Sequence, residues 1–238
     1  TPGILLVKPN GSTEPIRMAL ASIKAPRMIR EEGKEKLTRT QLYDNLMAFN
    51  AREMLRKKLV DGTVICFLRY ERSGQQQPAG AAPAKSAGPM SFWDVYVDGN
   101  NNVALMLMKE GLVQVVSHRA TDPKSHDYDS LCLAEQRAQS KKKGLFAFSE
   151  GIEIRRINDL SIEQSAQQST QFLPFLQRNA NMQCIVDYVF SASHLKLLLP
   201  SEFTLFSLNL SGARPPKQGE KYADKALEFV KSFIHMRE

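Results

Sequence analysis

The sequence predicts an α+β fold in which one strand–turn–helix unit occurs twice. An apolar strand within 16–27 ends at a cation followed by proline, and the segment 203–217 repeats this pattern. An amphipathic, alanine-containing helix follows each turn, over 50–59 in the first copy and 221–233 in the second. A repeated unit of this kind indicates one fold used twice.

The first copy continues with alternating apolar segments and short helices. Segments rich in β-branched, aromatic or alternating apolar residues, bounded by turn residues, predict strands at 4–7, 16–20, 63–70, 92–97 and 113–116. Helices are expected at 50–59, at 103–109 with Gly111 as the C-terminal glycine, and at 131–142. In the first of these helices the predicted core stripe consists of Ala51, Met54, Leu55 and Leu59.

Two segments of the first copy show no strand pattern. The charged segment 27–45 is predicted to be a long loop with at most a helical turn. The segment 73–89, composed of Gln, Ala, Gly and Pro, has too little apolar surface to offset the entropy of ordering. It is predicted to be a disordered loop at the tip of a hairpin.

Composition limits the class of protein. With 42% hydrophobic residues in 238, the chain can bury a substantial core. No apolar run approaches the roughly 20 residues that span a bilayer, so no membrane segment is expected. Three scattered cysteines, Cys66, Cys132 and Cys184, predict free thiols in a reducing compartment, the cytoplasm or also the nucleus.

The positive charge is concentrated in the first part of the chain. Residues 1–70 carry 13 basic and 7 acidic side chains, a surplus of six within a total net charge of +7. A basic surface favours polyanions, because binding releases their condensed counterions. An ordinary solvated face is the alternative interpretation.

Taken in order, these elements resemble the tandem repeats of the Tudor staphylococcal nuclease family. The resemblance lies in EKYADKALEF at 220–229, in VYVDGNNNVALMLMKEGLVQVV at 95–116 and in LCLAEQRAQSKKKGLFAF at 131–148. The last two strings resemble the family's closing hairpin, second helix and last helix. The fold that this resemblance implies is a pair of OB-like barrels with helices.

The resemblance also implies the domain boundaries. A staphylococcal nuclease-like domain is expected at 1–150 without the family's first strand, followed by a polar linker at 151–170. Residues 171–238 then correspond to the N-terminal half of a second such domain, so the second copy is incomplete.

By the same resemblance, the catalytic positions of the nuclease are substituted. Family hydrolases hold calcium with carboxylates and neutralise the phosphate with two arginines. The Asp and Glu of the turn correspond to Lys24 and Arg27 in the first copy, and to Arg214 and Lys217 in the second. The strand arginine corresponds to Ala19 and Asn209, the second arginine to Met90, and the aspartate of the first hairpin to Ser193. We therefore expect no catalytic residue, no metal site and no cofactor.

The same cations suit contact with phosphate oxygens, which requires no metal. The candidate nucleic-acid-binding residues are Lys24, Arg27, Arg52, Arg56, Lys57, Lys58, Lys141, Lys142, Lys143, Arg214 and Lys217. Drift of the turns after loss of catalysis is the alternative. The triplet 141–143 also complements a helix dipole. His118 and His126 lie in a polar loop without metal-ligand spacing, and a solvated loop is predicted there.

The function that follows is non-catalytic binding of RNA or another single-stranded nucleic acid by repeats of a larger protein. The family that these repeats resemble is linked to RNA silencing, including the RNA-induced silencing complex, and to RNA decay, splicing and transcriptional coactivation. One alternative is a protein-interaction scaffold whose basic surface meets acidic partners. Another is a calcium-dependent nuclease with relocated metal ligands. The sequence predicts no oligomeric state.

Overall fold

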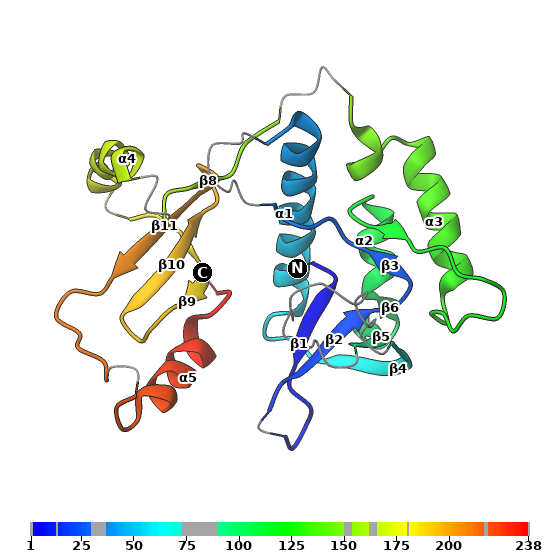
Figure 1. The fold of residues 1–238 in the computed structure, drawn as a ribbon, viewed down its shortest axis with the longest axis horizontal. Coiled ribbons are helices and arrows are strands. Elements are labelled where there is room, and N and C mark those ends of the chain that lie inside the picture. Colours follow the sequence, from blue (N-terminus) through cyan, green and yellow to red (C-terminus); the bar gives the residue numbers. More distant parts are fainter. Residues whose placement is uncertain are drawn as a thin grey trace, which may run out of the picture. The chain divides into compact units, whose positions relative to one another are not determined.

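The computed structural model describes residues 2–12, 14–29, 37–72, 90–149, 154–161, 166–179, 181–216 and 219–237. The chain divides into two compact units, residues 1–154 and 155–238, which are described separately below (Figure 1). The predicted loop at 73–89 lies outside the described residues, so its predicted disorder remains a prediction.

Unit 1 is built on a five-stranded sheet. Its elements are β1 (Ile4–Val7), β2 (Ile16–Leu20), β3 (Ile23–Lys24), α1 (Arg39–Leu59), β4 (Val64–Arg72), β5 (Met90–Val97), β6 (Asn101–Asn102), α2 (Val103–Lys109), β7 (Gln114–Val115), α3 (Tyr128–Ser140) and the 3-10 helix η1 (Gly144–Ala147). The sheet order is β1-β2-β5-β4, with β6 on β5, and β3 forms a separate ladder with β7. Among the described strands of unit 1, the β2–β5 pairing is the only parallel one. This mixture of sheet and helices matches the predicted α+β, OB-like class.

Helix α1 begins earlier than predicted. The segment 27–45 was expected to be a loop, but the helix starts at Arg39. Thr38 caps it, because its hydroxyl accepts from the Gln41 N–H while the Gln41 side chain accepts from the Thr38 N–H. This reciprocal capping box satisfies two N–H groups that would otherwise have no partner.

The core of unit 1 lies between the sheet and helices α1, α2 and α3. In the predicted stripe of α1, Ala51 and Leu55 are buried, and Met54 and Leu59 are half-buried against the same core. The stripe prediction is confirmed.

Two glycines bring the end of α2 against the end of α3. Gly111 follows α2 at φ +68°, as predicted for a C-terminal glycine. A Cβ on Gly111 would lie 2.4 Å from the Lys143 carbonyl oxygen, and one on Gly144 would lie 2.3 Å from the Gly111 oxygen. The Leu145 N–H donates to the same Gly111 oxygen at 2.8 Å. The two backbones approach so closely that neither position has room for a side chain.

Unit 2 contains a four-stranded sheet in the order β8-β11-β10-β9. Its elements are β8 (Asn158–Asp159), α4 (Ala166–Arg178), β9 (Ile185–Val189), β10 (His194–Leu199), β11 (Thr204–Asn209) and α5 (Ala223–Ile234). The strands β9, β10 and β11 are antiparallel neighbours, and β8 runs parallel to β11. A small apolar cluster centred on Val189, Leu195 and Leu197 packs against the inner side of α5.

The predicted linker at 151–170 is partly structured. Asn158–Asp159 is a strand of the second sheet, and α4 begins at Ala166. The Asp159 carboxylate accepts from Lys196 Nζ at 2.6 Å. Burial would raise the pKa of Asp159, but Lys196 and the Ser161 hydroxyl together hold that pKa below its usual value. An ion pair therefore joins Asp159, within the predicted linker, to Lys196 of β10.

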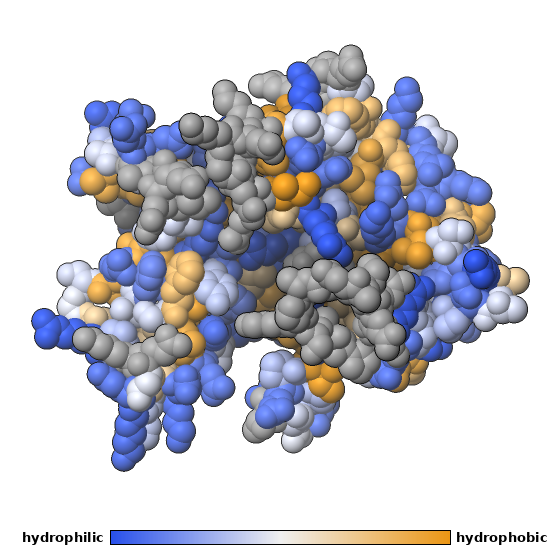
Figure 2. Space-filling model, viewed as in Figure 1, coloured by the Kyte–Doolittle hydropathy of each residue, from blue (hydrophilic) through white to orange (hydrophobic). Residues whose placement is uncertain are grey.

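Several apolar side chains remain on the surface (Figure 2). In unit 2 the most exposed aromatic rings belong to α5 and its N-terminus, where Tyr222, Phe229 and Phe233 are 59%, 64% and 59% exposed.

All three cysteines are free thiols, as predicted. Burial raises the pKa of the Cys66 and Cys184 thiols. No helix among the described residues is long and apolar enough to cross a membrane.

Candidate nucleic-acid interface

The turn that carries Lys24 and Arg27 projects from a buried anchor. Ser22 is only 1% exposed, and its N–H donates to the Tyr70 hydroxyl at 3.2 Å. Its hydroxyl accepts from the Ser125 N–H, and its carbonyl accepts from the Val116 N–H, both at 2.9 Å. Lys24 then pairs with Gln114 across the β3–β7 ladder. The side chains of Lys24 and Arg27 are both exposed at the end of this fixed strand.

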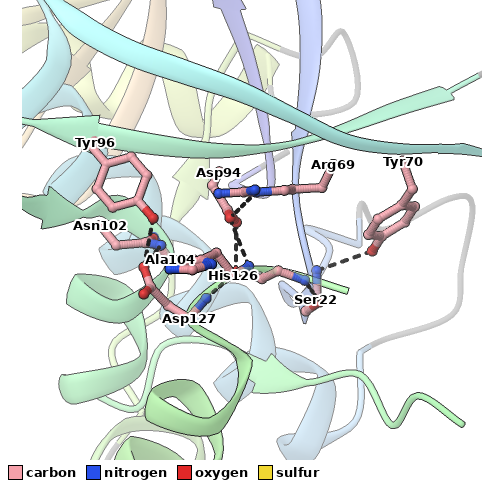
Figure 3. Close-up of polar contacts among 10 residues, drawn as sticks. Ser22, Arg69, Tyr70, Asp94, Tyr96, Asn102, Ala104, His126 and Asp127 are labelled. Carbon is pink, nitrogen blue, oxygen red and sulfur yellow. Dashed lines mark hydrogen bonds and ion pairs between the residues drawn. The ribbon is translucent and has the colours of Figure 1, made fainter. Parts of the chain in front are cut away.

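A buried carboxylate holds the neighbouring loop in place (Figure 3). Asp94 on β5 is 1% exposed and accepts from the Ser125 hydroxyl at 2.6 Å and from the His126 N–H at 2.9 Å. Arg69 on β4 donates to it from Nε at 2.5 Å. Since Ser125 also contacts Ser22, this network fixes the loop before α3 to the strand that leads to Lys24.

Asp127 closes the same network (Figure 3). Its carboxylate accepts from the Tyr96 hydroxyl at 2.8 Å and from Asn102 Nδ2 at 2.7 Å. Burial, and then the charge and hydrogen bond of Asp127, raise the pKa of Tyr96. Every polar side chain of this network has a structural partner, which favours a supporting role over a catalytic one.

The positions that the resemblance assigns to the two nuclease arginines lie on the neighbouring strands β2 and β5 and carry no charge. Ala19, at the strand position, is 6% exposed and lies opposite Phe92 in the β2–β5 pairing. Met90, at the second position, lies two residues before Phe92 on β5 and is 37% exposed. Small and apolar side chains therefore occupy the two positions that the resemblance assigns to these arginines.

The four candidate cations of α1 divide into two pairs. Arg56 is buried at 9% exposure, and its Nε donates to Glu53 at 2.9 Å, so its charge is already matched. Arg52 is half-buried, and its side chain or backbone also takes part in a noncovalent interaction within the chain. Lys57 and Lys58 are exposed in the last turn. Of these four cations, Lys57 and Lys58 expose their charge to solvent. Arg56 is not a surface contact, because it is buried and paired with Glu53.

The lysine triplet lies beyond α3, which ends at Ser140 rather than at Lys142 as predicted. All three lysines are exposed, and Lys143 forms an exposed ion pair with Glu110 at 3.4 Å. Arg137 is the cation in the last turn of α3 and Lys141 is its C-cap residue, so the helix dipole remains the alternative explanation for Lys141.

In unit 2, Arg214 is exposed after β11, whereas Lys217 lies outside the described residues. Ser193 and Asn209, the other positions compared with the nuclease, belong to the β9–β10 turn and to the end of β11. Within the described ranges, no group of three or more His, Cys, Asp or Glu could hold a metal ion.

The histidine loop differs from its prediction. His126 is exposed, as expected of a solvated loop, but the two ring nitrogens of His118 are buried. Two cations close to His118, Arg72 and Lys124, were also missed by sequence reasoning. The alternation of Tyr70 and Arg72 at the end of a strand was the sequence feature that could have indicated Arg72.

The fold and this turn define a staphylococcal nuclease-type domain, an OB-like α+β domain in which a strand–turn–helix unit carries Lys24 and Arg27. The chain belongs to the family described as staphylococcal nuclease homologue, whose sequence profile matches residues 17–147. This confirms the resemblance and the fold class inferred from the sequence.

Curated proteins similar to this chain carry names of the same family. It is 30% identical to Ribonuclease TUDOR 2 of Arabidopsis thaliana, over 93% of this chain and 23% of that protein. It is 31% identical to Staphylococcal nuclease domain-containing protein 1 of Drosophila melanogaster, over 83% and 21% respectively. Its identity to the Schizosaccharomyces pombe protein of that name is 30%, over 92% and 23%. The chain thus spans about a quarter of the length of these relatives.

Proposed function

We propose that this chain binds RNA or another single-stranded nucleic acid through its phosphates and does not cut it at these turns. The observation that carries the proposal is the exposed pair Lys24 and Arg27 at the end of an anchored strand. Two cations at this position repel a calcium ion, whereas they attract a phosphodiester. The relatives named as ribonucleases support nucleic acid as the ligand class.

The available charge of Lys24 and Arg27 supports a phosphate contact at this turn. Within the part of the chain that the structure describes, Lys24 and Arg27 have no ion pair. Lys57 and Lys58 on α1, with Lys141 and Lys142 after α3, supply further exposed charge in unit 1. Arg214 occupies the equivalent turn of unit 2. Cations of this kind contribute affinity without base preference.

In the larger setting, we propose that these repeats hold RNA for a multifunctional protein. Silencing, RNA decay, splicing and transcriptional coactivation are the processes that the family resemblance suggests, in the cytoplasm and the nucleus. Each would use the chain as a binding module, because the positions compared with the catalytic residues are cationic, small or apolar.

The test is a binding titration with a labelled single-stranded RNA, read by fluorescence anisotropy. The variant Lys24→Glu/Arg27→Glu should weaken binding by tenfold or more, equally for unrelated sequences. Lys8→Glu/Lys109→Glu makes the same change in net charge at two exposed sites outside the proposed contacts. Equal losses in both double variants would contradict a contact at the turn.

A protein-interaction scaffold is the second candidate, and one observation favours it. Strand β4 is the last strand of its sheet, and Ile65, Phe67 and Leu68 on it are 50%, 50% and 48% exposed. Exposed apolar residues on an edge strand are suited to protein contacts. Loss of binding to a protein partner in Phe67→Ser, with RNA affinity unchanged, would separate this function from the first.

A further inference from the structure

An aromatic cluster with two cations lies beside the anchored strand of unit 1. The ring of Phe92 on β5 stacks on that of Tyr70 on β4, with centroids 4.7 Å apart and an angle of 17°. The guanidinium carbon of Arg72 lies 5.5 Å from each of these two ring centroids. A guanidinium this close to two aromatic rings is attracted to them by cation–π interaction.

The cluster continues through the loop before α3. His118 meets Tyr70 edge-on with centroids 6.0 Å apart, and it meets Tyr128 in the same way at 5.4 Å. Lys124 Nζ lies 4.8 Å from the Tyr128 ring centroid. The rings therefore form a continuous row that begins under Arg72 and ends under Lys124.

The charges of Arg72 and Lys124 both act on His118, which lies between Tyr70 and Tyr128 in this row. Both of its ring nitrogens are buried, and neither has a hydrogen-bond partner among the described residues. Burial lowers the pKa of His118, and the charges of Arg72 and Lys124 lower it further against the opposing charge of Asp122. The imidazole is therefore neutral at pH 7, and the charge of the cluster comes from the two cations.

Arg72 and Lys124 both keep their donors available. Both side chains are exposed, and neither has an ion pair within the described ranges. Since the Arg72 side chain is exposed, its guanidinium can form paired hydrogen bonds to phosphate oxygens. A stacked arginine also loses less side-chain entropy when it binds.

The cluster adjoins the turn described above. The Tyr70 hydroxyl accepts from the Ser22 N–H, and Ser125, next to Lys124, donates to the Ser22 hydroxyl. Both ends of the row are therefore tied to the residue that anchors Lys24.

We propose that Arg72 and Lys124 form a further phosphate-contact site, which binds the backbone of the same single strand alongside Lys24 and Arg27. The ligand is a phosphodiester of a nucleic-acid strand, held by two cations over a neutral aromatic floor. This inference rests on the proposed function and extends its contact surface.

The experiment measures RNA affinity across a salt series for the full chain and for Arg72→Gln, Lys124→Gln and the control Lys109→Gln. For single strands, each lost phosphate contact should reduce the slope of log K against log salt by about 0.7. The Arg72 and Lys124 variants should show this reduction, whereas the exposed control should not. Arg72→Lys, which keeps the charge but not the planar edge, should be intermediate and guards against misfolding of the glutamine variant.

The ring protons of His118 provide an independent readout by NMR. Bound RNA should raise the pKa of His118, because a phosphate offsets the charges of Arg72 and Lys124, and this rise should shrink in both glutamine variants. An unchanged salt slope in both glutamine variants, with binding still lost in Lys24→Glu/Arg27→Glu, would overturn this inference alone. No RNA binding by the unaltered chain would overturn the proposed function as well. Inorganic phosphate that raises the His118 pKa at the same concentration as RNA would overturn the assignment to a strand.

Discussion

The same strand–turn–helix unit occurs in two settings within this chain, and the two helices differ in burial. In unit 1, α1 buries side chains along its length, including Met47, Ala51 and Leu55. In unit 2, every residue of α5 is described, and none is buried. The rings of Phe229 and Phe233 remain more than half exposed.

The difference shows where the burial of the repeated helix comes from. In unit 1, the β4–β5 hairpin and helices α2 and α3 follow the helix in sequence and share its core. Among the described residues of unit 2, the cluster that α5 covers is formed by β9, β10, β11 and the preceding Cys184. The strand–turn–helix unit therefore presents its cationic turn in both settings, but it does not by itself complete a core.

The largest expected effect separates the two units. Residues 1–154 alone should unfold in one cooperative thermal transition, because that unit holds a complete core. Residues 155–238 alone should show no cooperative monomeric transition, since the apolar face of α5 remains in water. Circular dichroism at several concentrations, with size-exclusion chromatography, provides the measurement. A sharp, concentration-independent transition of monomeric 155–238 would refute the comparison.

A second prediction tests how unit 1 closes its core. Gly144→Ala should destabilise unit 1 by about 2–5 kcal/mol, because the new Cβ meets the Gly111 oxygen at a positive φ. Gly99→Ala is the control, since Gly99 has φ +78° and no atom within 4 Å of the added Cβ. Urea unfolding should show a clearly smaller loss for Gly99→Ala. Similar losses would mean that backbone conformation alone matters and that the glycine contact does not.

A third, smaller effect concerns the ion pair of unit 2. Asp159→Asn should destabilise unit 2 by about 1–3 kcal/mol at pH 7, because buried Lys196 loses its charged partner. The pKa of Asp159 is lowered in the folded chain, so its stabilisation is present above the usual carboxyl pKa, about 3.9. That stabilisation disappears as the pH falls through the lowered value.

The pH series checks this sign. The unaltered chain and Asp159→Asn should differ at pH 7 and converge towards pH 3 in chemical unfolding followed by circular dichroism. Glu202→Gln, at an exposed carboxylate of the same unit, should leave stability unchanged at both values. A constant difference across the range would assign the effect to packing instead of charge.

Sequence periodicity predicted the repeated unit and most of the strands, because alternation and turn residues are local properties. The start of α1 was missed although Thr38 and Gln41 have capping-box spacing, since the preceding charges obscured the pattern. Strand β8 was missed because two polar residues carry no periodic signal. Its pairing with β11 depends on tertiary structure.

The candidate site was predictable only in part. The resemblance located the cationic turn at Lys24, but exposure and pairing required coordinates. Arg56 was predicted to be a surface cation, although Glu53 lies three residues earlier on the same helix, where it can form an ion pair with Arg56. Arg72 and Lys124 could not be joined from the sequence, because only packing of β4 against the loop before α3 brings the row of rings together.

The most direct measurement is an electrophoretic assay of end-labelled single-stranded RNA with purified full chain, in calcium and in chelator. The account predicts a shifted but intact strand in both conditions, with the shift lost in Lys24→Glu/Arg27→Glu and retained in Lys8→Glu/Lys109→Glu. Calcium-dependent shortening of the strand, abolished by a point substitution within this chain, would contradict the account.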